Sequence, residues 1–398
     1  MKTAPLRQPF SRQLLTAFRS LFFASALVAS VAFPAHTQDR LTIAANGGGS
    51  GPLADTLAAV AMTGLSEVDF VELNLAVTGD DQLIVFPQPR LDGLTNVSEL
   101  FPERAREDGS YHIADFTLQE IRQLRRTSAA HNAAIDSGSP APPSLGIASL
   151  EETLALLRSI EQQEAKRIGI APNLNFVGDY KKEGKDVSRL LIATLADFGY
   201  SGEEPVMVQS GDGDELQRIK EELLPLYGLT IPLVQRVSTA AGISQPDNSF
   251  TADLDHSWVF TRLGLRMVSS YADALILPGS YVHKGQPSPL PPGFIDDART
   301  LGLDMFVTTN SASPGALPEF AASYDQLLDY YYTELGLDGV LTADSAQTLD
   351  YLVRLATQEE EELKKVQLAE QQAFPLSVYL QRQAIEKEEA AVQATTKL

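Results

Sequence analysis

The chain has 398 residues, a formal net charge of −21 and a globular composition, with 44% hydrophobic and 21% charged residues. This composition excludes a wholly disordered or fibrous protein. The excess of acidic residues repels nucleic-acid phosphates, so we expect no nucleic-acid partner. The sequence has no cysteine and five histidines. Disulfides, thiolate metal sites and a cysteine nucleophile are therefore excluded, and histidine chemistry depends on very few residues.

The N-terminal segment, residues 1–37, has the pattern of a secretory signal peptide. It carries four basic residues and no acidic one, and an apolar run covers 21–33. This run falls within the ~7–15 residues of a signal-peptide core and is shorter than the roughly 20 residues of a spanning helix. The alternative is an uncleaved membrane anchor, because 34–37 is not a clean Ala-x-Ala site. We predict an exported protein, periplasmic or extracellular, with no transmembrane span after cleavage.

From residue 40 onward, short β-rich runs alternate with amphipathic helical patterns. The predicted strands are 40–46, 69–77, 167–175, 204–209, 231–237, 273–278, 304–309 and 338–343. The predicted helices are 148–165, 184–199, 212–225, 260–271, 290–301 and 321–336. Parallel strands are joined by helical crossovers, so this alternation predicts an α/β fold, a closed (β/α)8 TIM barrel, over residues 38–356.

Two segments depart from this alternation. After a short β-rich run at 83–86, residues 88–147 carry one predicted helix, near 117–126, and a loop rich in Ser, Pro and Ala. We interpret them as a small insertion on the barrel after the second strand. Residues 357–398 are rich in charged helix formers and contain Pro375. They predict an acidic helical tail broken at that proline, either solvated or pairing with a partner or a second copy.

An ordered series of motifs resembles the periplasmic glycerophosphodiester phosphodiesterases, members of the phospholipase C-like phosphodiesterase superfamily. The segments that carry the resemblance are 71–73 (VEL), 78–85 (TGDDQLIV), 101–106 (FPERAR), 115–118 (DFTL), 183–186 (EGKD), 198–200 (FGY), 214–220 (DELQRIK) and 317–320 (LPEF). The resemblance covers nearly all of residues 40–355 and implies a (β/α) barrel with an insertion after the second strand. It also implies hydrolysis of glycerophosphodiesters to glycerol 3-phosphate and an alcohol, with two His as acid and base, an Arg on the phosphate and carboxylates that hold Ca²⁺.

Most positions to which the resemblance assigns this chemistry hold other residue types. The family's His-Arg-Gly on the first strand stands here as Ala45-Asn46-Gly47, and its second His falls at Pro87. Alanine and proline side chains cannot transfer a proton, so both acid/base positions lack a titratable group. The resemblance places the family's metal ligands at positions that hold mostly neutral residues here. These are Ala54 (beside Asp55), Glu72 with Asn74, Asn173 with Asn175, and Ala343 (beside Asp344).

Substitutes for the missing groups are few. Glu72 with Asp55, Asn74, Asn173 and Asp344 would hold a cation weakly, because Ca²⁺ affinity depends on the number of charged ligands. His283, in the loop after the sixth strand, is the best candidate for a replacement base, since active sites lie at that end of a barrel. Its alternative interpretation is an ordinary surface histidine. Ser50, in a glycine-rich loop, is either a nucleophile or part of a flexible connection.

The predicted lining of the barrel mouth is polar and weakly acidic. Its members are Asn46, Glu72, Asn74, Asn173, Asn175, Gln209 and Thr308. Amides pair well with hydroxyl groups, so this lining suits a small neutral polyol or sugar-like ligand better than a phosphate.

Three hypotheses follow. The first is an exported glycerophosphodiester phosphodiesterase-family protein that has lost catalysis, a pseudoenzyme with a binding or interaction role. It needs no cofactor, and its ligand would be a small polyol or a glycerophosphodiester. The alternative is an active glycerophosphodiester phosphodiesterase with a drifted active site, using His283 as base and Ca²⁺ at Glu72. The third is an assembly protein that self-associates through its C-terminal helices.

Overall fold

The structure is a computed structural model that describes residues 40–49, 53–127, 146–238, 255–285, 290–309 and 314–369. The predicted signal segment, Ser50 and Pro375 lie outside these residues. The chain forms two compact units, Met1–Thr348 and Leu349–Leu398.

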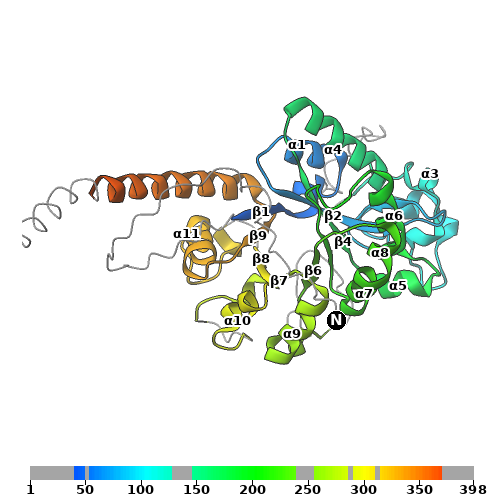
Figure 1. Cartoon of the computed structure of the whole chain (residues 1–398). Helices are drawn as coiled ribbons and strands as arrows, with labels where there is room; N and C mark the ends of the chain where they lie inside the picture. Colours follow the sequence, from blue (N-terminus) through cyan, green and yellow to red (C-terminus); the bar gives the residue numbers. More distant parts are fainter. Residues whose placement is uncertain are drawn as a thin grey trace, which may run out of the picture. The chain divides into compact units, whose positions relative to one another are not determined.

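Eight parallel strands close a barrel in the first unit (Figure 1). They are β1 (Leu41–Ala44), β2 (Phe70–Val77), β4 (Gly169–Leu174), β5 (Val208–Ser210), β6 (Leu233–Arg236), β7 (Ala274–Pro278), β8 (Asp304–Thr308) and β9 (Gly339–Thr342). Strand β1 pairs with both β9 and β2, which closes the sheet on itself. This closed ring of eight parallel strands confirms the predicted (β/α)8 TIM barrel. The short strand β3 (Leu83–Val85) pairs antiparallel with β2.

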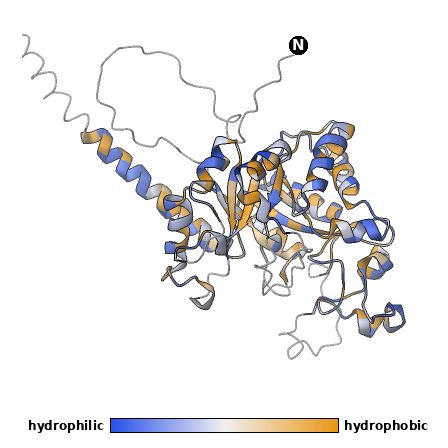
Figure 2. Ribbon diagram, turned by 90° about the horizontal axis from the view of Figure 1, so that it is seen from below, coloured by the Kyte–Doolittle hydropathy of each residue, from blue (hydrophilic) through white to orange (hydrophobic). Residues whose placement is uncertain are grey.

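Strand periodicity explains the barrel core and also places the site. Residues two apart on a strand share a face, and one face of each strand fills the interior with apolar side chains. These include Ile43, Phe70, Ala171, Met207, Val234, Ile276, Phe306 and Leu341. On β2, β4, β5 and β6, the residue two positions after the apolar core residue also points inward, toward the carboxyl ends of the strands. These residues are Glu72, Asn173, Gln209 and Arg236. The central strands are accordingly the most hydrophobic part of the ribbon (Figure 2).

Helices surround the barrel strands (Figure 1). Their bounds are α1 (Leu57–Gly64), α4 (Leu150–Glu164), α5 (Val177–Lys182), α6 (Val187–Asp197), α7 (Gly213–Arg218), α8 (Leu224–Tyr227), α9 (Arg262–Tyr271), α10 (Phe294–Thr300) and α11 (Tyr324–Asp329). Side-chain oxygens of Thr56, Ser149, Asp186, Asp212 and Thr261 accept backbone N–H groups at the starts of α1, α4, α6, α7 and α9. Such N-caps satisfy donors that the helix itself leaves free. Each of the six predicted helices overlaps an observed one.

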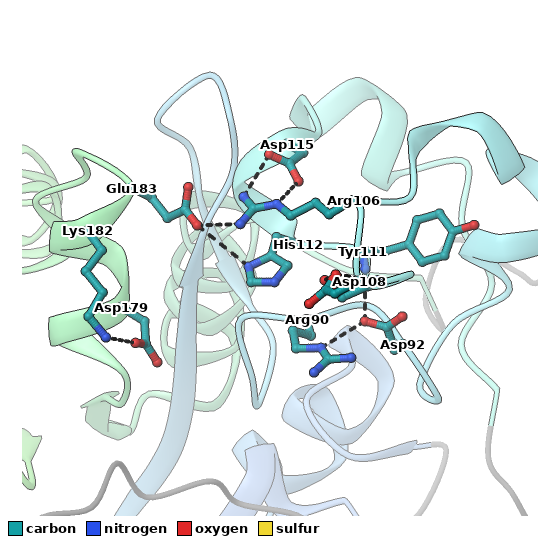
Figure 3. Close-up of polar contacts among 11 residues, drawn as sticks. Arg90, Asp92, Arg106, Asp108, Tyr111, His112, Asp115, Asp179, Lys182 and Glu183 are labelled. Atoms are coloured by element: carbon teal, nitrogen blue, oxygen red, sulfur yellow. Dashed lines mark hydrogen bonds and ion pairs between the residues drawn. The ribbon is translucent and has the colours of Figure 1, made fainter.

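The described residues between β3 and α4 include two short α-helices, α2 (Val97–Leu100) and α3 (Leu118–Ile121). The predicted helix near 117–126 is therefore shorter than expected, because the chain beyond α3 turns back and Arg126 forms a bridge with Thr95. Arg106 fixes this segment to the barrel (Figure 3). Its guanidinium donates to both carboxylate oxygens of Asp115, at 2.7 and 2.9 Å, and to Glu183, directly after α5, at 2.7 Å.

These contacts shift the pKa values of Arg106, Asp115 and Glu183. Hydrogen bonds from Arg106 hold the pKa of the Asp115 and Glu183 carboxyls below their usual values. The carboxylates in turn raise the pKa of Arg106. His112 adds its Nδ1 atom 3.8 Å from Glu183 (Figure 3). The insertion is thus anchored by charge to the connection that follows β4.

Aspartates mark the opposite, amino-terminal end of the barrel. The carboxylates of Asp69, Asp273 and Asp338 each accept a backbone N–H from the neighbouring strand, at 2.7, 3.0 and 2.7 Å. Asp304 begins β8 beside two of them. Burial, together with the charges of Asp338 and Asp273, raises the pKa of its carboxyl to about 7.

The last helix of the described residues runs from 345 to 369. Its side chains beyond 357 are exposed, and Lys364 and Lys365 pair with Glu360 and Glu362 one turn earlier. The described part of the predicted tail, residues 357–369, is therefore helical. Within the described ranges, no helix combines the length and the apolar character needed to cross a membrane.

Candidate functional site

The polar residues at the carboxyl ends of the strands gather around Glu72 of β2, which is only 3% exposed. One oxygen, Oε1, accepts hydrogen bonds from Nη1 of Arg236 at 2.5 Å, Nε2 of Gln209 at 3.2 Å and Nδ2 of Asn173 at 3.5 Å. The other, Oε2, accepts the backbone N–H of Asn46 at 3.0 Å. The carboxylate is therefore surrounded by donors.

A second network joins the amides of the mouth. Nδ2 of Asn74 donates to Oδ1 of Asn46 at 3.0 Å and to Oδ1 of Asp55 at 3.2 Å. Its own Oδ1 accepts from Asn173 at 2.9 Å and from Asn175 at 3.4 Å. Strand register explains the arrangement, since Asn74 pairs directly with Asn173. Of the predicted lining, the structure thus brings together every member except Thr308, which ends β8 on the inward-facing parity.

The turn after β1 is shaped to bring Asn46 to this network. Asn46 has a φ of 53°, in the left-handed region that asparagine tolerates better than most residues. Its carbonyl accepts the N–H of Gly49 at 3.2 Å and of Asp55 at 2.8 Å. The loop is thereby folded back on itself, and Asp55 is carried into the mouth.

Two arginines join the site that the sequence analysis did not name. Arg236 ends β6, and its inward direction follows from Val234, a core residue two positions earlier. The predicted strand 231–237 therefore contained the signal that would have found it. Arg126 comes from the insertion and is half-buried, with its guanidinium 5.0 Å from the centre of the Phe86 ring. These two guanidiniums offset the two carboxylates, so the mouth is more balanced in charge than the acidic lining we expected.

Asp55 is the strongly perturbed group of the mouth. Burial raises the pKa of its carboxyl to about 6; Arg126 and the Asn74 hydrogen bond oppose this shift, and Glu72 adds to it. Burial also lowers the pKa of Arg126. Three buried atoms here have no hydrogen-bond partner among the described residues: Oδ2 of Asp55, Oδ1 of Asn173 and Nη1 of Arg126.

The other predicted residues lie in different surroundings. Ala45 is buried and packs in the barrel core, and Pro87 follows β3 next to Phe86. Asp344 immediately precedes the 345–369 helix and donates its N–H to Oγ1 of Thr342 at 3.0 Å. None of these placements supplies a proton-transfer group to Glu72.

His283 lies in an aromatic cluster after β7. Its Nε2 is 3.0 Å from the hydroxyl of Tyr331, and its ring packs edge-on against Phe320 with centroids 5.5 Å apart. Burial lowers its pKa, which favours the neutral imidazole. A neutral histidine is the form a base requires, but these contacts hold it against Tyr331.

A Ca²⁺ ion does not fit the described residues around Glu72. Calcium needs about 6–8 oxygen ligands, whereas the groups that contact the Glu72 carboxylate turn N–H donors toward it, and its oxygens already accept four hydrogen bonds. In the part of the chain that the structure describes, no group of three or more His, Asp or Glu side chains could hold a metal ion.

Comparisons with known proteins identify the family. The profile of the glycerophosphoryl diester phosphodiesterase family matches residues 47–347. The chain belongs to this family. A glycerophosphodiester phosphodiesterase of Treponema pallidum is 30% identical over 337 residues, covering 80% of this chain and 92% of the relative. One of Haemophilus influenzae is 29% identical over 322 residues, covering 76% and 87%. The resemblance found in the sequence is confirmed.

Solved structures share the family's fold. A phosphodiesterase of Oleispira antarctica, in complex with sn-glycerol-3-phosphate, has a TM-score of 0.52 at 16% identity, covering 78% of this chain and 96% of its own. A glycerophosphoryl diester phosphodiesterase from Silicibacter pomeroyi has a TM-score of 0.53 at 16% identity, covering 80% and 95%. At this identity the likeness concerns the barrel alone.

Proposed function

We propose that this glycerophosphodiester phosphodiesterase-family protein is a pseudoenzyme that binds a glycerophosphodiester, or its polyol part, at the mouth of the barrel without hydrolysing it. The observation that carries the proposal is the state of Glu72. This carboxylate is held by Arg236, Gln209, Asn173 and the Asn46 amide. Its lone pairs are thus used to organise neighbouring side chains rather than to hold a metal.

The chemistry of the mouth supports binding. Ala45 and Pro87 occupy the positions to which the family resemblance assigns the acid and the base, and neither side chain exchanges protons. The amides of Asn74, Asn173 and Asn175 offer both donors and acceptors to hydroxyl groups. The substrate class comes from the names of the two curated relatives.

Hydrolysis is the second candidate, and the comparisons favour it. Both relatives are named as enzymes, and the match covers most of the length of each. One observation in the mouth also favours it. Asp55, with a pKa of about 6, exchanges its proton near neutral pH, as a general acid or base must. It is better placed for this than His283, because it is hydrogen-bonded to the Glu72–Asn74 network.

One experiment separates the two candidates. Purified protein is titrated calorimetrically with glycerophosphocholine, and release of glycerol 3-phosphate is followed with and without Ca²⁺. We expect binding without turnover. Turnover that Asp55→Asn or Glu72→Ala removes, and that the surface substitution Asp296→Asn leaves intact, would establish hydrolysis instead. Asp296 is a suitable control because its side chain is 85% exposed.

Two further proposals concern the ends of the chain. Residues 1–37 are expected to direct export and to be removed, which N-terminal sequencing of the secreted protein tests. The C-terminal helices are expected to mediate self-association. Deletion of 357–398 should then lower the number of subunits per particle in solution, and an unchanged number of subunits would remove this role.

A further inference from the structure

Arg236 uses only one edge of its guanidinium within the protein. Nη1 donates to Oε1 of Glu72 at 2.5 Å and to Oε1 of Gln209 at 3.1 Å. No hydrogen bond is found from Nε or Nη2 to any described residue. The side chain is 25% exposed, whereas Glu72 is 3% exposed. The guanidinium therefore lies between a buried carboxylate and the open end of the barrel.

This guanidinium stands where a metal ion bound to Glu72 would lie. A buried carboxylate needs a neighbouring positive charge, because burial of an unpaired charge is costly. The 2.5 Å separation of Nη1 and Oε1 equals a typical Ca²⁺–oxygen distance of about 2.3–2.6 Å. Guanidinium and calcium cannot both occupy that position on Oε1.

The free edge of Arg236 has the geometry for an anion. Nε and one hydrogen of Nη2 point in parallel, and this fork matches two oxygens of a phosphate group. The other arginine of the mouth is less suited, since the guanidinium of Arg126 lies over the Phe86 ring and its charge already interacts with Asp55.

We infer that the Arg236 guanidinium takes the place of a metal ion at the barrel mouth. One of its edges donates to Glu72, and the other binds two oxygens of a phosphate monoester or diester. Anion binding at this site therefore requires no metal ion. The inference rests on the proposed function and deepens it, because it assigns recognition of the phosphate to one residue. Glu72 then acts as the positioning residue that orients Arg236.

The test measures affinity for sn-glycerol 3-phosphate, inorganic phosphate and glycerol by calorimetry, in EDTA and in Ca²⁺. Wild-type protein is compared with Arg236→Lys, Glu72→Gln and the control Arg262→Gln, whose side chain is 83% exposed on the surface. The midpoint of thermal unfolding of each variant is measured first. Arg236→Lys keeps the charge beside Glu72, so it tests the inference even if Glu72→Gln does not fold.

We expect EDTA to leave phosphate affinity unchanged and Arg236→Lys to weaken it about 10-fold, because lysine lacks the planar fork. Affinity for glycerol should not change. In Glu72→Gln the amide oxygen can still accept from Nη1 of Arg236 and orient it, so this variant should tighten phosphate binding several-fold, because it removes a negative charge close to the anion. A metal-dependent site predicts the opposite result, since loss of its carboxylate ligand would weaken binding.

The outcomes separate this inference from the proposed function. Loss of phosphate binding in EDTA, weaker binding by Glu72→Gln, or equal affinities for Arg236→Lys and Arg262→Gln would overturn the role of Arg236 while ligand binding at the mouth stands. The role of Arg236 would also be overturned if the wild-type protein bound glycerol but bound neither sn-glycerol 3-phosphate nor inorganic phosphate. Failure to bind glycerophosphocholine or any of these probes would overturn both.

Discussion

Removal of the Arg236 guanidinium should destabilise the barrel markedly. The substitution Arg236→Met keeps a long unbranched side chain and deletes only the charged group. Glu72, which is only 3% exposed, then loses the guanidinium that pairs with it. Two unit charges with centres about 4 Å apart interact by about 4 kcal/mol at an effective dielectric constant near 20. Breaking a buried pair by removing one partner costs about 3–5 kcal/mol, and the partial exposure of Arg236 places our expectation near 3 kcal/mol.

A double-mutant cycle isolates this pair from the rest of the network. Glu72→Gln alone should also destabilise the fold, because an amide nitrogen then faces a donor, yet Arg236→Met should cost little more in that background. We expect a coupling free energy of about 2 kcal/mol, since residues in direct contact deviate from additivity by this amount.

Urea unfolding at neutral pH, followed by far-UV circular dichroism and by the fluorescence of the single tryptophan, Trp258, gives the four free energies. Arg262→Met serves as the control for loss of an arginine at the surface. The reasoning is refuted if Arg236→Met costs less than about 1 kcal/mol or if the two substitutions are additive.

Three further predictions concern the scaffold. The Asp304 carboxyl has a pKa of about 7 in the folded protein against 3.8 ordinarily, so the folded state retains a proton and stability falls as pH rises through this window. Asp304→Asn should remove that fall and stabilise the protein by about 2–4 kcal/mol at pH 8, with little effect at pH 4, as measured by urea midpoints. Gly48 has a φ of +80°, and an added Cβ would lie 1.7 Å from Oγ1 of Thr63, whereas Gly109, with the same φ, has open space. Gly48→Ala should therefore cost about 3 kcal/mol and Gly109→Ala about 1 kcal/mol, and equal costs by the same assay would contradict the steric argument. Arg106→Met should lower stability by only about 1 kcal/mol, because its ion pairs are partly exposed, and the loss should shrink in high salt when thermal midpoints are compared.

Local sequence determined the barrel and much of the mouth. Alternation of apolar residues along the strands defines which side chains point inward, and this holds for Glu72 and Asn74 on β2 and for Asn173 on β4. Their adjacency follows from parallel register, in which Asn74 lies beside Asn173. The same alternation turns Arg236 inward, two positions after Val234, but the sequence analysis did not draw that conclusion.

Only the tertiary structure decided which charges meet. Glu72 and Arg236 lie on strands that are not paired with each other, since β4 and β5 separate β2 from β6, and their contact across the interior depends on the curvature of the closed barrel. Arg126 comes from the insertion, where it bridges with Thr95 and lies over the Phe86 ring, and its charge acts on Asp55 from a remote part of the chain. Periodicity is a property of neighbouring residues, whereas electrostatic pairing and burial depend on the distances that closure of the chain imposes between remote ones.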